Sequence, residues 1–185
     1  MRLTPLITGL LFLTFLSIPV FSSSISIDPK LKENCVSGSA DSTNYVLRGS
    51  NWVEVSASDF EKRGWQDAGK VWRGASGAIL AELEVPDSPD AQDWVRTTDF
   101  CYRADAHLSE IKTVVMTEWG WKKTESRRYA TDHSIQSRAL SYTSTKTGAE
   151  IPQPYLESGD IPELVVYWTS ADLPMAGLLK LKSSH

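Results

Sequence analysis

The sequence predicts a mostly β fold, an antiparallel meander or partly closed barrel with one or two short helices. Short runs of strand-forming residues recur from Asn44 onward and are separated by turn signals. The run 108–121 alternates between apolar and polar residues with a period of two, as a half-buried strand does. A capping box at 58–61, closely followed by Gly64, indicates one short helix. An α+β arrangement, with a helix packed on the sheet, is the alternative.

Residues 1–22 have the pattern of a secretory signal peptide and are not expected to belong to the fold. Arg2 provides a positive start, and an uncharged apolar stretch of about 15 residues follows. That stretch is shorter than the roughly 20 residues that span a bilayer as a helix. Cleavage after Ser22 leaves 163 of the 185 residues and a net charge of −5, enough chain for one domain. We therefore expect a secreted or periplasmic protein with no stable membrane insertion.

The rest of the chain divides into a poorly structured N-terminal segment, 23–43, and a single β-rich domain, 44–185. The first segment is polar and rich in serine. It contains Cys35, and the only other cysteine is Cys101. An even pair of cysteines in an oxidising compartment predicts a disulfide, worth on the order of 4 kcal/mol for a loop of this length. Free buried thiols and a catalytic cysteine are the alternatives.

The predicted strands follow one another through the β-rich domain. In chain order they are 45–47, 52–55, 71–73, 78–85, 94–102, 108–121, the hairpin pair 124–130 and 135–142, and 164–168. Between the last two, residues 143–163 contain three prolines and two glycines without periodicity, which is typical of a binding loop or lid. Residues 171–181 are expected to form a short closing helix.

A short internal repeat accompanies the predicted hairpins. Residues 102–108 and 129–135 both fit Tyr-x-x-Asp-x-x-apolar, and 72–79 is a looser copy. In each full copy an aromatic residue ends one strand and an aspartate opens the turn. Residues 102–142 thus resemble the hairpin unit of YD-type (RHS-like) repeats, although Ala106 and His133 stand where those repeats have glycine. The resemblance implies an antiparallel meander with tandem turns at one end, and it implies no activity.

Tryptophan is unusually frequent, with seven in the chain. The alternation places Trp119 and Trp121 on the same face as Ile111, which favours a place in the core. In exported proteins, however, exposed aromatic residues also bind sugar rings or apolar ligands. The candidate ligand-binding residues are therefore Trp65, Trp119, Trp121 and Tyr155.

The sequence contains no convincing set of catalytic residues. Asp132, His133 and Ser134 are adjacent, whereas the members of a hydrolase triad converge from distant segments. His107 and His133 are expected at the same end of the sheet, but no metal-ligand spacing supports a metal site, and no cofactor is expected. The candidate acids for a glycoside hydrolase all take polar-face positions where a solvated carboxylate is expected: Glu82, Glu84, Glu110 and Glu118.

The charge distribution limits the classes of partner. The chain has a formal net charge of −4 and no basic cluster, which argues against nucleic acid and against anionic membrane surfaces. Four cations within 122–128 are interleaved with acids and predict a solvated hairpin tip: Lys122, Lys123, Arg127 and Arg128.

These observations support three functions, in order of preference. The first is an exported, non-catalytic β-rich domain of unassigned role that acts through protein contacts. The second is a binding module for a carbohydrate or an apolar ligand, which uses the tryptophans and the 143–163 loop. The third is a hydrolase that uses the strand carboxylates.

Overall fold

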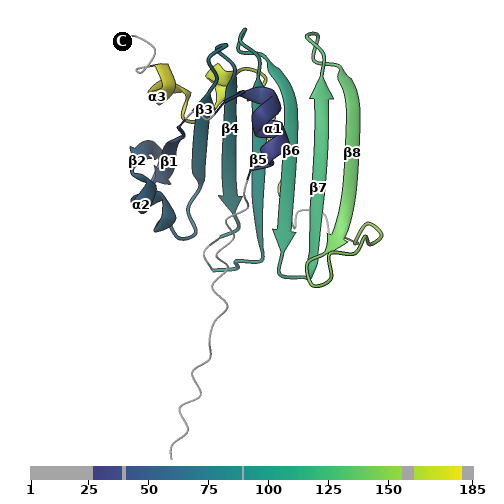
Figure 1. Cartoon of the computed structure of the whole chain (residues 1–185). Coiled ribbons are helices and arrows are strands. Elements are labelled where there is room, and N and C mark those ends of the chain that lie inside the picture. Colours follow the sequence, from purple (N-terminus) through teal and green to yellow (C-terminus); the bar gives the residue numbers. More distant parts are fainter. Residues whose placement is uncertain (1–26, 39–40, 89, 156–160, 181–185) are drawn as a thin grey trace, which may run out of the picture.

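The computed structural model describes residues 27–38, 41–88, 90–155 and 161–180, so the predicted signal peptide lies outside the described residues. Eight strands form one sheet in the order β2-β1-β3-β4-β5-β6-β7-β8 (Figure 1). The strands are β1 (Thr43–Arg48), β2 (Asn51–Val55), β3 (Ala68–Arg73), β4 (Ile79–Pro86), β5 (Trp94–Tyr102), β6 (Leu108–Thr117), β7 (Trp121–Tyr129) and β8 (Ile135–Ser144). The helices are α1 (Pro29–Cys35), α2 (Ala57–Glu61), the 3-10 turn η1 (Ser170–Asp172) and α3 (Ala176–Lys180).

The predicted mostly β, antiparallel fold is confirmed, and the sheet stays open instead of closing into a barrel. From β3 to β8 each strand pairs with its neighbour in the sequence, whereas β1 lies between β2 and β3. The two edges of the sheet are therefore β2 and β8. Among the described residues, no helix has the length and hydropathy needed to cross a membrane.

The two faces of the sheet carry separate cores. Phe100 and its cross-strand partners Ala81 and Ile111 point to one face, which residues 161–180 cover; we call it the C-terminal face. Cys101, one residue further along β5, points to the opposite face, which carries α1; we call it the helix face. The larger core lies on the C-terminal face and includes Tyr45, Phe100, Tyr102, Leu108, Ile111, Leu173, Met175 and Leu179.

Helix α1 forms within the segment that the sequence predicts to be poorly structured. The side chain of Asp28 accepts a hydrogen bond from the backbone N–H of Lys30 at 2.9 Å and caps the helix. Pro29 occupies the first helical position, where its missing N–H would have had no partner in the helix. These two residues are the local signals for α1 that the serine-rich composition obscured.

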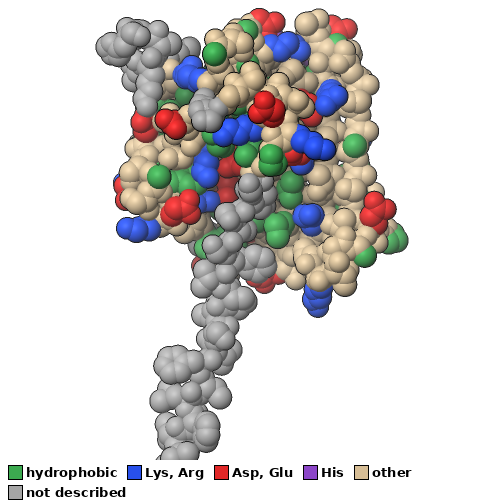
Figure 2. Space-filling model, viewed as in Figure 1, with side chains coloured by type: hydrophobic (Ala, Val, Ile, Leu, Met, Phe, Trp, Pro, Cys, Tyr) green, Lys and Arg blue, Asp and Glu red, His purple; other side chains and the backbone are tan. Residues whose placement is uncertain are grey.

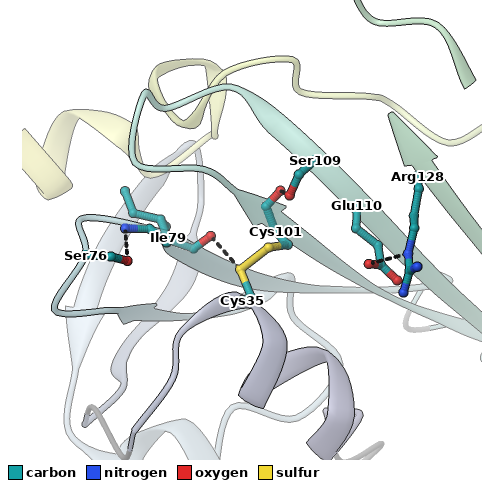
Figure 3. The surroundings of a disulfide bond; sticks show 8 residues. Cys35, Ser76, Ile79, Cys101, Ser109, Glu110 and Arg128 are labelled. Carbon is teal, nitrogen blue, oxygen red and sulfur yellow. Dashed lines mark hydrogen bonds and ion pairs between the residues drawn. A yellow bond between two sulfur atoms is a disulfide. The ribbon is translucent and has the colours of Figure 1, made fainter. Parts of the chain in front are cut away.

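The predicted disulfide between Cys35 and Cys101 is present and ties α1 to β5 (Figure 3). The Sγ atom of Cys35 also lies 3.4 Å from the carbonyl oxygen of Ile79 on β4. At the other end of the helix, Lys112 on β6 forms an ion pair with the Asp28 cap. Both ends of α1 are thereby attached to the middle of the sheet.

Residues 164–168 do not form the predicted last strand. They cross the C-terminal face, where the hydroxyl of Tyr102 donates to the carbonyl of Tyr167 at 3.1 Å. The N–H of Leu108 donates to the carbonyl of Trp168 at 2.9 Å. The run is apolar because it packs onto the sheet, and a short apolar run does not distinguish a strand from a covering segment. The predicted closing helix is limited to α3.

Three turns at one end of the sheet, 74–78, 103–107 and 130–134, have the same construction. In each turn the backbone N–H of the first residue donates to the carbonyl of the fifth at 2.9 Å. The side chain of the third residue accepts a hydrogen bond from the N–H of the fifth, through Ser76, Asp105 and Asp132. The fourth residue has a positive φ, at Gly77, Ala106 and His133. Asp132 and His133 thus serve a turn, as their adjacency in the sequence suggested.

The predicted strand 108–121 is too long. Strand β6 ends at Thr117, and Gly120, with a φ of 92°, makes the turn into β7. Trp119 therefore lies in a turn, while Trp121 begins the next strand. The prediction that both indoles share the inward face is wrong for Trp119, because strand alternation stops where the strand stops.

Two further local predictions were wrong. The cations of 122–128 lie within β7 and not at a hairpin tip, because the turn falls at 118–120. The N-cap of α2 is Ser56, whose side chain accepts from the N–H of Asp59 at 3.1 Å, and not Ser58. The required spacing of three residues is already met two positions earlier, directly after β2 ends.

We expect replacement of both Cys35 and Cys101 by alanine to lower the free energy of unfolding by about 2 to 5 kcal/mol. The bridge closes a loop between residues 66 positions apart, and it holds α1 over β5. Urea denaturation followed by tryptophan fluorescence measures the change. A Lys30→Ala variant, altered at an exposed position of α1, is the control and should unfold like the parent. Equal stability of the double variant and the parent would contradict the expectation.

Candidate functional site

The aromatic candidates do not form one platform. Trp121 is buried with Trp94 and Tyr142, whereas Trp119 is 46% exposed and its ring centroid lies 6.0 Å from that of Trp121. The two other candidates lie outside regular strands: Tyr155 is exposed and Trp65 is half-buried. In the described part of the chain, a ring contact joins only Trp119 and Trp121 of these four. Among them, the indole of Trp119 has an open surface and is supported by a core residue.

The two described histidines meet at the turn end of the sheet, as the repeat predicts. Their ring centroids lie 6.0 Å apart, and His133 stacks on Trp168 at 4.5 Å. The nearby carboxylates, Asp105 and Asp132, accept hydrogen bonds within their own turns. Within the described residues, no group of three or more His, Cys, Asp or Glu side chains is arranged to hold a metal ion.

A charged row crosses the helix face beside α1. Cross-strand pairing places Lys70 of β3 opposite Glu82 of β4, Glu82 opposite Asp99 of β5, and Asp99 opposite Lys112 of β6. Figure 2 shows Lys and Arg side chains beside Asp and Glu side chains on this face. The two central acids are buried, with exposed fractions of 6% for Glu82 and 5% for Asp99.

Burial makes these two carboxyls hold protons at unusually high pH. Desolvation raises the pKa of Glu82 to about 7, against a smaller lowering by Lys70. Desolvation and, to a smaller extent, the charge of Glu82 raise the pKa of Asp99 to about 8. Lys112 already pairs with Asp28, and Oδ1 of Asp99 has no hydrogen-bond partner among the described residues. Both carboxyls are therefore partly protonated near neutral pH.

The sequence did not identify this pair. Glu82 was considered as a solvated acid of a polar face, and Asp99 was not a candidate. Polar alternation indicates a solvated face only when nothing covers it, and here the helix face carries α1. Two buried acids with raised pKa values resemble the general acid of a hydrolase, yet their small exposed fractions leave little surface for a substrate.

Strands β7 and β8, residues 121–144, form the second candidate site, which we call the β7–β8 wing. On its C-terminal face Glu125 is buried beneath three cations. Nε of Arg127 and of Arg138 lie 2.7 and 2.8 Å from its Oε1, and Nζ of Lys123 lies 3.2 Å from its Oε2. Burial alone would raise the pKa of Glu125, but hydrogen bonds from Arg127 and Lys123 hold it at about 2.

The outer half of the β7–β8 wing is uncovered. All residues of β8 from Ile135 to Leu140 are exposed, so neither face of the strand is packed there. Ile135 is 53% exposed and Leu140 is 41% exposed. Of the strands that the structure describes, none lies beyond β8, although the 145–151 hairpin pairs with its last residues. An exposed edge of this kind is a template for pairing with another chain.

The wing also differs in charge from the rest of the protein. It contains five Lys or Arg and two Asp or Glu residues, a formal net charge of +3 in a chain of net charge −4. On the C-terminal face, three cations surround one carboxylate, so two positive charges are not balanced within that cluster. The wing is therefore a positively charged, uncovered edge.

We expect the free energy of unfolding to fall as the pH rises from about 4 to about 8, by roughly 3 to 9 kcal/mol. The pKa values of Glu82 and Asp99 are raised in the folded state. The folded protein therefore keeps protons that the unfolded chain has released, and this stabilisation is lost as the pH passes the folded pKa values.

An Asp99→Asn variant tests this expectation, because it removes one member of the pair. Its stability should vary less over this pH range, and at pH 9 it should exceed that of the parent in urea denaturation. Asp90→Asn, at an exposed loop position, is the matched control. A variant with the parental pH profile would show that the pair does not titrate as described.

We expect Glu125→Gln to lower the free energy of unfolding at pH 7 by on the order of 1 to 3 kcal/mol, because it leaves three cations without their shared partner. The pKa of Glu125 is lowered in the folded state, so its contribution is present above about pH 4.5 and is lost as the pH falls towards 2. Glu110→Gln removes the acid of a more exposed pair with Arg128 and should cost less. If the two variants lost equal free energy of unfolding, Glu125 would stabilise the fold no more than Glu110 does, and the expectation would be contradicted.

The fold and both candidate sites are built from residues of this one chain. No protein-family model, curated protein or solved structure matches it, so the resemblance of residues 102–142 to YD-type repeats stays a prediction.

Proposed function

We propose that this protein is an exported, non-catalytic β-rich protein that acts through protein contacts, and that the β7–β8 wing is its contact surface. One observation carries the proposal: β8 is exposed from Ile135 to Leu140 on both faces. Natural proteins usually cover, shorten or charge such edges, because they pair readily with other chains. Here Arg138 is the only charged residue of β8, so the edge is open and lightly protected.

Export to the periplasm or the cell exterior is part of the proposal. Its support is the disulfide between Cys35 and Cys101, since such bonds persist in oxidising compartments. The signal-like pattern of residues 1–22 points the same way.

Two other functions have less support. A carbohydrate or apolar-ligand module would rely on the open indole of Trp119, because Trp121 is buried in the core. A hydrolase would need substrate to reach Glu82 and Asp99, whose side chains are buried. The wing, in contrast, offers an open strand edge and exposed apolar side chains together.

Photo-crosslinking in the cells that produce the protein tests the proposal. A photoreactive phenylalanine analogue at Ala139, exposed on β8, should give a discrete crosslinked product that mass spectrometry identifies as one protein partner. The same analogue at Ala75, exposed in the turn after β3, is the control and should give none. The proposal that the wing is the contact surface would be refuted if the analogue at Ala139 gave no crosslinked product. It would also be refuted if the two positions gave identical products.

A further inference from the structure

The direction of the backbone groups along the edge of β8 can be worked out from Tyr142, near the C-terminal end of the strand. The carbonyl of Tyr142 accepts from the N–H of Ile151 at 3.0 Å, so the backbone groups of Tyr142 point away from β7. Backbone groups alternate in direction along a regular strand, so those of Leu140 and Arg138 point the same way, and the alternation ends at the register shift between Ser137 and Ile135. Leu140 and Arg138 each have one N–H and one C=O group for pairing with a further strand.

The side chains beside these groups define what could lie next to them. Arg138 and Leu140 are paired with Arg127 and Glu125 of β7, so they project on the C-terminal face. Small side chains, Ser137, Ala139 and Ser141, project on the helix face. An added strand would therefore meet a cation and an apolar side chain on one face and only small side chains on the other.

A second copy of this chain fits the edge poorly. Antiparallel pairing of two β8 strands through Leu140 and Arg138 would place the Arg138 side chains of the two copies diagonal to one another on the same face. Like charges at this separation repel one another. Each wing also carries a formal charge of +3, which repels a second wing. Charge favours a partner of the opposite sign.

We propose that the open edge of β8 binds an extended acidic segment of another protein, which adds to the sheet as a further strand. This inference rests on the proposed function and specifies its partner. An acidic side chain of the segment lies beside Arg138, where the cations around Glu125 leave positive charge unbalanced. An apolar side chain two positions away contacts Leu140, and main-chain hydrogen bonds to Arg138 and Leu140 supply the pairing.

The test uses the full protein and a fluorescein-labelled, end-blocked peptide of repeating glutamate-serine-valine-serine, in which glutamate and valine lie two positions apart on one face of a strand. Fluorescence anisotropy should show saturable binding, and the same peptide with lysine in place of each glutamate should not bind. Two further acidic peptides carry N-methyl groups on every second residue. In one frame the odd-numbered residues are methylated, and in the other frame the even-numbered residues are methylated. One frame should bind about tenfold more weakly, because an added strand uses the N–H groups of only one of its edges.

Charge-matched variants locate the binding. Arg138→Gln should weaken acidic-peptide binding about fivefold, because the cation lies beside the added strand. Arg48→Gln removes one exposed cation on β1, at the far side of the sheet, and should leave binding unchanged. Equal effects of the two variants, or of the two N-methyl frames, would reduce the binding to general charge attraction and overturn the proposal.

Other outcomes separate this inference from the proposed function. The proposal that an acidic strand binds β8 would be overturned if the peptide did not bind at 1 mM. It would also be overturned if the polysaccharide heparin bound equally tightly. If Ala139 still crosslinks to a discrete protein in that case, the wing remains a contact surface for a different partner. Self-association in sedimentation experiments that Arg138→Gln strengthens would identify a second copy as the occupant instead. Failure of both crosslinking and peptide binding would refute both proposals.

Discussion

An open sheet has two faces to bury, and within its described residues this chain covers them chiefly with α1 and residues 161–180. Both segments pack over the central strands. On one face Cys35 is bonded to Cys101 of β5. On the other, Met175 approaches the backbone of β3 so closely that a Cβ at Gly69 would lie 2.5 Å from its Cε. The core is therefore concentrated between β3 and β6, and the last two strands extend beyond it.

The same uneven coverage determines where charge is buried and where it is open. Glu82 and Asp99 lie on the central strands beside α1, lose their contact with water, and hold protons as a result. Arg138 lies on the last strand, where no covering segment packs, and keeps much of its surface exposed. The helix face thus holds two partly protonated carboxyls at its centre, whereas the C-terminal face holds a hydrated cation at the rim of the sheet. Which of these occurs is decided by distance from the covering segments.

The sequence predicts those features that depend on neighbours in the chain. The fold class followed from alternation and turn signals. The bond between Cys35 and Cys101 joins distant residues, but two cysteines allow only one pairing within the chain, and the expected export favours it. Other features that depend on distant contacts were missed. The run 164–168 has strand-like composition but crosses the sheet, and Asp99 is polar in pattern but buried in fact. Trp119 is a case between the two, because Gly120 was a local turn signal that the longer alternation concealed.

The segment that covers the C-terminal face consists of the last described residues of the chain, which has consequences for the time at which the protein can fold. The side chain of Arg73 donates to the carbonyl of Leu179, across 106 positions of sequence. Until residues 161–180 have been synthesised, the apolar face that contains Phe100 and Ile111 has no cover. Contacts of such long range form slowly. Until they form, the exposed apolar surface makes the chain prone to aggregation. The core of the C-terminal face can therefore form only after residues 161–180 have been synthesised.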